Sequence, residues 1–188
     1  MTRIIAGAIG SLQLKPAAKA TRPTSDRVKE SLFAKLDAMG VLEGSRVLDL
    51  FAGTGALGLE SASRGAESVD LVERDRNAFD LLQQNIKSSL SSFEKQGLPK
   101  KIHAHNQDAH RFLKSVTAGF DLVFIDPPYE FPNSELEELV ESVAALLSDD
   151  GLVVVERSSR SEQLDVESLE LQSSKTYGDT AVWIYEKP

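Results

Sequence analysis

The sequence predicts an α/β fold: a Rossmann-like, doubly wound, mainly parallel seven-stranded sheet with an antiparallel C-terminal strand, plus a short N-terminal hairpin and helix extension. Two observations support this prediction. Short apolar runs alternate along the chain with segments whose apolar residues recur at helical spacing, which is typical of successive β and α units. A length of 188 residues is sufficient for one such domain with a substantial core.

Residues 1–40 form the predicted extension, and residues 41–188 form the main domain. Glycines and prolines interrupt residues 1–23 and predict a small hairpin or an extended arm. An amphipathic helix is expected over 25–39, because apolar residues follow at helical spacing until Gly40 ends the pattern.

Strands and helices then alternate to the end of the chain. Apolar runs predict five strands, over 47–51, 68–73, 102–107, 121–126 and 151–156. Two further runs, 169–175 and 180–186, flank a Tyr-Gly-Asp turn and predict an antiparallel pair. Helices are expected over 56–64, from Asp75, over 109–116, and from a capping box formed by Ser134 and Glu137. The serine-rich stretch 88–99 is expected to be an irregular connection.

A glycine-rich turn joins the first core strand to the helix that follows it. Gly53, Gly55 and Gly58 match the G-x-G-x-x-G pattern, whose glycines allow a tight turn, close approach of backbone to ligand, and close packing of helix on strand. Glu73 lies 20 residues after Gly53, at the end of the second strand, where a carboxylate can accept hydrogen bonds from ribose hydroxyls. The ligand is therefore expected to carry a ribose.

Asp49 lies within the first core strand, just before this loop. An anion at that place opposes the pyrophosphate of a dinucleotide and favours a cationic ligand. S-Adenosylmethionine combines a ribose with a cationic sulfonium and an amino group, so it is the expected cofactor. A nicotinamide cofactor, and a tight turn that binds nothing, are the alternatives.

The segment Asp126-Pro127-Pro128-Tyr129 ends the fourth core strand. The prolines lack N–H groups and stop sheet pairing, so main-chain carbonyls become available to other donors. Asp126 and the Pro127 carbonyl can accept the two hydrogens of a nucleobase amine while Tyr129 stacks on the ring. Holding those hydrogens out of the ring plane localises the amine lone pair toward a methyl donor. Hydride transfer gives the segment no role; a turn that only ends the strand is the structural alternative.

Basic residues gather at the start of an acidic chain. The first 35 residues hold seven bases and two acids, a local charge of +5, so the remaining residues carry −13 within the total of −8. This distribution is typical of a phosphate-contacting arm on a small-molecule-binding domain. Solvated side chains on an extension are the alternative.

Composition narrows the class of protein further. The chain has no cysteine, which excludes disulfides, thiol catalysis and cysteine-based metal sites. His103 and His105 have no clear third ligand, so no metal is expected. No apolar run approaches the ~20 residues of a membrane span, and no secretory signal is evident, so we expect a cytoplasmic protein without a membrane partner.

Two N-terminal stretches, Arg3 to Gly7 and Arg22 to Phe33, complete a pattern that is similar to a known family. The chain resembles the bacterial 16S ribosomal RNA guanine-N2 methyltransferases of the small, single-domain RsmD type, from Arg3 to Thr180. The Arg-Pro-Thr stretch at 22–24 is the more specific mark, because many amino-methyltransferases share the glycine loop and Asp-Pro-Pro-Tyr.

The resemblance implies roles for individual residues. Asp49, Phe51, Gly53 and Gly55 would hold the methionine part of the cofactor, Glu73 the ribose, and Asp108 with Ala109 the adenine; Asp108 is equally explained as a helix cap. Asp126, Pro127 and Tyr129 would hold the target amine. The residues that would contact RNA are Arg3, Lys15, Lys19, Arg22, Arg27 and Lys29. Segment 8–13 lacks the basic residues usual in the family, which shifts the expected contact toward Lys15, Lys19 and Arg22.

The expected protein is thus a monomeric methyltransferase that modifies one guanine N2 of 16S rRNA, in the small ribosomal subunit or its assembly intermediate. Residues 41–188 would be its S-adenosylmethionine-dependent domain and residues 1–40 its RNA-contacting extension. Two alternatives stay open. Asp-Pro-Pro-Tyr equally suits an adenine N6 in DNA or RNA, although a DNA enzyme would lack a target-recognition domain. A non-catalytic RNA-binding factor would need neither Asp126 nor the glycine loop.

Overall fold

The computed structural model describes residues 2–16, 26–117 and 119–188. Its helices are α1 (Asp26–Met39), α2 (Ala56–Ser63), α3 (Arg76–Lys95), α4 (Ala109–Leu113) and α5 (Asn133–Ala144). Its strands are β1 (Arg46–Asp49), β2 (Ser68–Val72), β3 (Lys101–His105), β4 (Phe120–Ile125), β5 (Leu147–Ser158), β6 (Glu170–Tyr177) and β7 (Thr180–Glu186).

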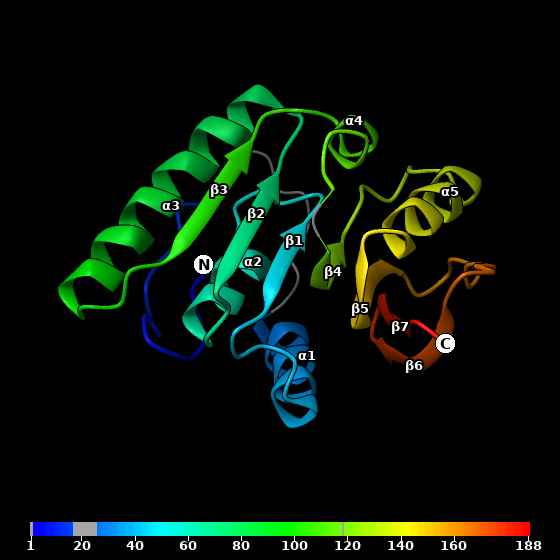
Figure 1. The fold of residues 1–188 in the computed structure, drawn as a ribbon, viewed down its shortest axis with the longest axis horizontal. Helices are drawn as coiled ribbons and strands as arrows, with labels where there is room; N and C mark the ends of the chain where they lie inside the picture. The colour runs from blue at the N-terminus through cyan, green and yellow to red at the C-terminus, as the bar shows by residue number, and fades with distance from the viewer. Residues whose placement is uncertain (1, 17–25, 118) are drawn as a thin grey trace.

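These strands form one seven-stranded sheet in the order β3-β2-β1-β4-β5-β7-β6 (Figure 1). Strands β1 to β5 run parallel, and β7 pairs antiparallel with both β5 and β6. The fold class predicted from the alternating pattern is confirmed.

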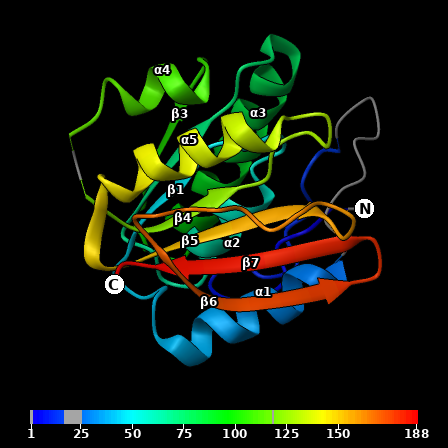
Figure 2. The same cartoon turned by 90° about the vertical axis from the view of Figure 1, so that its right-hand side faces the viewer.

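Helices cover both faces of the sheet. The first three helices pack on one face, with Phe33 and Leu59 in the core, and α4 and α5 pack on the other face, with Phe112 and Leu139. Figure 2 shows α1 lying alongside β6 and β7 at one end of the sheet. Successive strand residues enter different cores because side chains of a strand alternate between its two faces.

The chain reverses its direction across the sheet between β1 and β4. It first builds outward from β1 through β2 to β3, and then returns to place β4 on the other side of β1. In this pairing Asp49 lies opposite Phe124. Ligands of open α/β sheets bind in the crevice beyond the carboxyl ends of the two strands at such a reversal. The segments after Asp49 and Ile125 flank that crevice.

Three helix predictions need correction. The stretch 88–99 is not an irregular connection, because α3 continues to Lys95 with its serine hydroxyls bonded to carbonyls four residues earlier. The capping box does not form: α5 begins at Asn133 after Pro132, and Glu137 instead accepts a hydrogen bond from the Asp165 N–H, 3.0 Å. Helix α4 ends at Leu113, earlier than expected.

The described part of the N-terminal segment, residues 2–16, forms a hairpin-like loop. Arg3 and Gln13 make an antiparallel bridge, and the Ile4 N–H donates to the Leu12 carbonyl, 2.9 Å. Ile4 is fully buried in the same core as α1 and α2. None of the helices in the described ranges is long and apolar enough to cross a bilayer.

Candidate active site

Glycines shape the loop that leads from β1 into α2. Gly55 is the N-cap of α2 with a left-handed φ of 82°, which favours glycine. A Cβ on Gly58 would lie 2.3 Å from a methyl carbon of Leu71, so only glycine lets α2 approach β2 this closely. The Gly53 N–H donates to Glu73 Oε2, 2.9 Å, and thereby ties the loop to the end of β2.

Asp49 is the buried carboxylate of this site, with 1% of its surface exposed. Its Oδ2 accepts a hydrogen bond from the Gly58 N–H, 3.2 Å, whereas Oδ1 has no partner among the described residues. Burial raises the pKa of Asp49 to about 7, against the lowering effect of the Gly58 N–H. A buried acceptor without a donor is rare in folded proteins. The amino group of S-adenosylmethionine is a cationic donor, so the residues present fit the expected cofactor.

Two other acidic residues lie at strand ends and bind main-chain N–H groups. Glu73 Oε1 accepts from the Asp75 N–H, 2.7 Å, and each oxygen of this carboxylate keeps a second lone pair that a ribose hydroxyl can use. Asp108 caps α4 by accepting from the N–H groups of His110 and Arg111, 3.0 and 3.4 Å. The capping role weighed for Asp108 is therefore observed. Ala109, which follows it, is buried.

The Asp-Pro-Pro-Tyr segment extends from β4 beside the glycine loop. Pro127 is buried, Asp126 is half-buried and the side chain of Tyr129 is 50% exposed. The Pro128 carbonyl is occupied, because it accepts from the Phe131 N–H, 2.9 Å, and from Arg157, 3.3 Å. No donor within the described residues reaches the Pro127 carbonyl, which is the carbonyl expected to accept the target amine.

Arg157 donates hydrogen bonds to main-chain carbonyls of this segment, a role that the sequence did not indicate. The residue is 4% exposed, and its Nη2 donates to the Phe131 carbonyl, 2.8 Å, and to Asn133 Oδ1, 3.1 Å. Burial lowers the pKa of Arg157, while the nearby charge of Asp126 opposes this effect. The available signal was an arginine two residues after the apolar run of β5, separated from it by Glu156.

Two contacts connect the parts of the site. The rings of Phe51 and Phe131 meet edge to face with centroids 5.5 Å apart, which joins the glycine loop to the segment after β4. Asn85 of α3 donates to the Thr54 carbonyl, 2.9 Å, and exchanges hydrogen bonds with both main-chain groups of Lys15. The role of Asn85 was also not predicted from the sequence. The available signal was its position, as a polar residue, within the apolar stripe of α3.

The residues expected to contact RNA have different surroundings. Arg3, Lys15 and Arg27 are exposed, although Lys15 Nζ donates to Gln84 Oε1, 2.7 Å. Lys19 and Arg22 lie outside the described residues. The assignment of Lys29 needs correction: its side chain is fully buried and its ammonium donates to the Arg3 carbonyl, 2.7 Å, so it does not face a phosphate.

The order of the strands, the glycine loop and the Asp-Pro-Pro-Tyr segment at neighbouring strand ends define a Rossmann-like methyltransferase. No group of three potential metal ligands occurs within the described ranges. The family model described as "Conserved hypothetical protein 95" matches residues 2–186. The chain belongs to this family.

Individual relatives agree with this membership. A Bacillus subtilis protein named "Putative rRNA methyltransferase YlbH" is 38% identical over 192 residues, which cover 98% of each chain. "Ribosomal RNA small subunit methyltransferase D" of Haemophilus influenzae is 33% identical over 187 residues, 98% of this chain and 93% of that protein. The solved structure titled "Putative methyltransferase yhhF from Escherichia coli" has a TM-score of 0.82 and 32% identity, and covers 98% of this chain and 97% of its own. The family resemblance expected from the sequence is confirmed.

Proposed function

We propose that this protein transfers the methyl group of S-adenosylmethionine to the exocyclic N2 amine of a guanine in 16S rRNA. One observation carries the proposal: the orphaned carboxylate oxygen of Asp49 and the available carbonyl of Pro127 follow two adjacent strands at the reversal of the sheet. The carboxylate oxygen of Asp49 suits a cationic methyl donor, and the carbonyl of Pro127 suits the hydrogens of an amine. The names of the relatives, which are rRNA methyltransferases, support rRNA as the substrate.

S-Adenosylmethionine supplies an electrophilic methyl group on a sulfonium sulfur. In the proposed site Asp49 and the loop with Phe51, Gly53 and Gly55 hold its amino-acid part, Glu73 holds the ribose, and Asp108 with Ala109 faces the adenine. These residues bring the donor to a fixed place beside β4, and positioning of this kind supplies much of the rate.

The substrate side of the reaction belongs to the segment after β4. Asp126 and the Pro127 carbonyl accept the two amine hydrogens and direct the nitrogen lone pair toward the methyl group, and the exposed Tyr129 ring stacks on the base. Passage of the methyl group to the amine would break its bond to sulfur and leave S-adenosylhomocysteine, and the nitrogen would release one proton, for which Asp126 is the acceptor that the site presents. Arg157 keeps the segment in place through the Pro128 and Phe131 carbonyls.

The rest of the chain is assigned accordingly. Residues 41–188 form the catalytic domain, and residues 1–40 form the RNA-contacting extension, in which Arg3, Lys15, Lys19, Arg22 and Arg27 are the proposed cations. Lys29 is removed from this set because it is buried. A 16S rRNA substrate, free or in a small-subunit particle, places the protein in the cytoplasm, and we assign it as a monomer.

The test is transfer of labelled methyl groups to unmodified small ribosomal subunits, free 16S rRNA and duplex DNA. Asp126→Ala should lower transfer at least ~100-fold, because it removes an acceptor used in the transition state, while affinity for S-adenosylhomocysteine stays within a few-fold. Asp150→Ala, at an exposed position near the start of β5, which begins at Leu147, is the matched control and should keep full activity.

The identity of the labelled product separates the alternatives. N2-methylguanosine in 16S rRNA is the expected product. N6-methyladenosine, or label on DNA, would contradict the proposed substrate but keep the chemistry. No transfer to any of the three substrates would favour the non-catalytic RNA-binding factor.

A further inference from the structure

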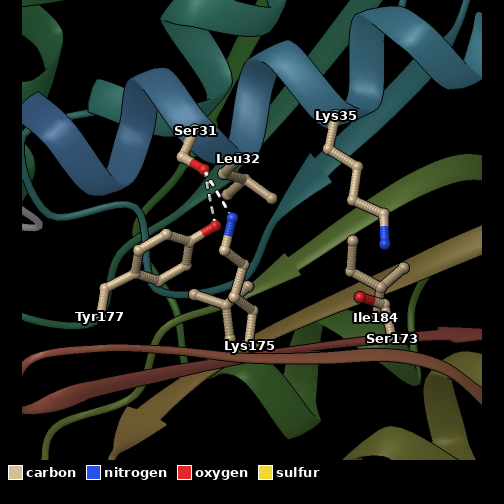
Figure 3. Close-up of a pocket in the computed structure, with 8 residues that line it drawn as sticks. Ser31, Leu32, Lys35, Ser173, Lys175, Tyr177 and Ile184 are labelled. Carbon is tan, nitrogen blue, oxygen red and sulfur yellow. Dashed lines mark hydrogen bonds between the residues drawn. The ribbon is translucent and has the colours of Figure 1, made fainter.

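A pocket of about 220 Å³ lies between α1 and the antiparallel strands β6 and β7 (Figure 3). None of its lining residues belongs to the candidate active site. Its floor is apolar and its walls carry hydroxyl and ammonium groups. The lining consists of Ser31, Leu32, Lys35, Ser173, Lys175, Tyr177, Val182 and Ile184.

Polar groups converge on this pocket from opposite walls. Lys35 extends toward it from α1, whereas Lys175 extends toward it from β6 (Figure 3). Lys175 Nζ lies 3.4 Å from Ser31 Oγ and 4.9 Å from the centroid of the Tyr177 ring. The Tyr177 hydroxyl lies 2.7 Å from the same Ser31 oxygen. The ammonium of Lys175 is therefore oriented by an aromatic ring and a hydroxyl.

No carboxylate neutralises these two lysines. Some exposed cations of the chain have acidic partners, such as Lys101 with Glu67 at 3.0 Å and Arg76 with Asp80 at 3.2 Å. No acidic residue lines the pocket, and within the described residues neither Lys35 nor Lys175 forms an ion pair. In a chain with a net charge of −8, two unpaired ammonium groups at one pocket favour an anion. Ammonium and hydroxyl donors together are typical ligands of phosphate oxygens.

The cations continue along α1 beyond the pocket. Arg27, Ser31 and Lys35 follow at intervals of four residues, so they share one face of the helix and are spaced about 6 Å apart along its axis. Arg27 is exposed. A single free phosphate cannot bridge the ~12 Å between Arg27 and Lys35, whereas a nucleic-acid backbone can.

The face of α1 that carries Arg27, Ser31 and Lys35 leads toward the candidate active site. Ser31 meets Tyr177 at the end of β6, and the turn after Tyr177 returns the chain to the carboxyl end of β5. There Thr180 pairs with Ser158, and the Ser159 N–H donates to the Asp179 carbonyl, 2.9 Å. This is the edge of the sheet from which the segment with Asp126 extends. A backbone that follows α1 therefore runs toward the place of the target base.

We propose that the pocket between α1 and β6 is a phosphate subsite for the RNA substrate. Lys35, Lys175 and the Ser31 hydroxyl hold one backbone phosphate at a distance from the modified nucleotide, and Arg27 contacts a phosphate nearer to it. The inference rests on the proposed function, since it requires that the substrate is RNA.

The experiment compares the Lys35→Gln/Lys175→Gln double variant with the wild type in binding to unmodified 16S rRNA over a range of salt concentrations. Loss of both ammonium contacts to this phosphate should weaken binding about tenfold or more at low salt, and it should reduce the slope of log affinity against log salt concentration by about 1. The KM for RNA should rise, while the affinity for S-adenosylhomocysteine is unchanged. Lys87→Gln removes the same charge from an exposed position of α3 and should behave as the wild type.

The outcomes separate the subsite from the function itself. If the wild type methylates 16S rRNA but the double variant binds it like Lys87→Gln, the subsite is wrong and the proposed function stands. If the double variant loses affinity for inorganic phosphate but keeps its affinity for RNA, the pocket binds a free anion and the inference is overturned. If the wild type neither binds nor methylates RNA, the proposed function fails, and the subsite fails with it.

Discussion

Five charged side chains are buried among the described residues, and the hydrogen bonds of three of them, Glu60, Lys29 and Asp49, distinguish structural from functional roles. Glu60 is fully buried and accepts from the Ile5 and Ala6 N–H groups and from Arg64, so its charge is satisfied internally. Lys29 is satisfied by the Arg3 carbonyl, and burial lowers its pKa. Asp49 alone of the three keeps an oxygen without a donor among the described residues. Burial of a charge is compensated by hydrogen bonds or by a ligand, so Asp49 is where a ligand is expected.

The raised pKa of Asp49 predicts a specific dependence of stability on pH. The folded-state pKa is about 7, above the ordinary value of 3.8. Between these two pH values the unfolded chain releases a proton that the folded chain keeps, so the free energy of unfolding of the ligand-free protein falls as pH rises. The loss should be about 2–4 kcal/mol, and it should be complete above pH 7.

Asp49→Asn tests this dependence, because it cannot ionise. Urea unfolding at pH 5 and pH 8 should show the wild type losing more stability than the variant over that interval. An equal loss in both proteins would mean that Asp49 is already ionised at pH 5. The variant should also bind S-adenosylhomocysteine more weakly, since the amide lacks the negative charge.

At the scale of elements, the N-terminal hairpin joins α1 to α2. Lys29 of α1 binds the Arg3 carbonyl, whereas Glu60 of α2 binds the Ile5 and Ala6 N–H groups. Three further bonds involve Ser63 at the end of α2. Its carbonyl accepts from the Ala8 N–H, 2.7 Å, and its hydroxyl accepts from the Ile9 N–H and donates to the Ala6 carbonyl. The stretch Arg3 to Gly7, which marks the family in the sequence, thus has a structural explanation. It fixes the segment that leads into the basic arm.

Gly7 makes this docking testable. Its φ is 82°, and a Cβ there would lie 2.0 Å from the Ser63 carbonyl oxygen. Gly40 has a similar φ of 71° with nothing within 4 Å of the same position. Gly40→Ala should therefore lower the free energy of unfolding by only the backbone penalty, roughly 1–2 kcal/mol. Gly7→Ala should cost about 2 kcal/mol more, because the hairpin must also shift away from α2.

Urea unfolding of both glycine variants supplies the measurement. An equal dependence of the free energy of unfolding on urea concentration would show that both variants unfold in the same way. Equal losses of stability would show that the hairpin can move off α2 without cost, which would contradict the role of the contacts with Glu60 and Ser63.

At the scale of the whole molecule, the site exists because the sheet reverses between β1 and β4. This order brings Asp49 and Asp126, which are far apart in the sequence, to adjacent strand ends. Helix α3 then connects the glycine loop to the start of the arm, since Asn85 bonds to both Thr54 and Lys15. Binding of a ligand to the folded state should consequently stabilise the whole domain.

A ligand-induced shift of the melting temperature measures this stabilisation. S-Adenosylhomocysteine at 100 times its Kd should add about 2.7 kcal/mol, which corresponds to roughly 5–10 °C for a domain of this size. The shift should persist in Asp126→Ala and be lost in Asp49→Ala. NAD at the same concentration should have no effect; a larger shift with NAD would contradict the assignment of the cofactor.

The sequence alone determined the features that depend on neighbouring residues. Apolar periodicity predicted six of the seven strands close to their observed bounds, whereas β5 begins four residues earlier than expected, at Leu147. The glycine pattern predicted the loop with Gly55 and Gly58. The position of Asp126 after a buried strand was evident for the same reason. Such features are local, because the φ of a glycine or the alternation of a strand is set within a few residues.

The tertiary structure decided which polar groups find partners. Lys29 was expected to face RNA, but its partner is Arg3, 26 positions away; Asn85 binds Lys15 across 70 positions. Arg157 and the pocket between α1 and β6 likewise depend on segments that meet only in the folded chain. A local pattern shows that a residue is polar and whether its face is buried. Which group satisfies it is determined by contacts between distant segments, because most buried donors and acceptors are paired within the packed core.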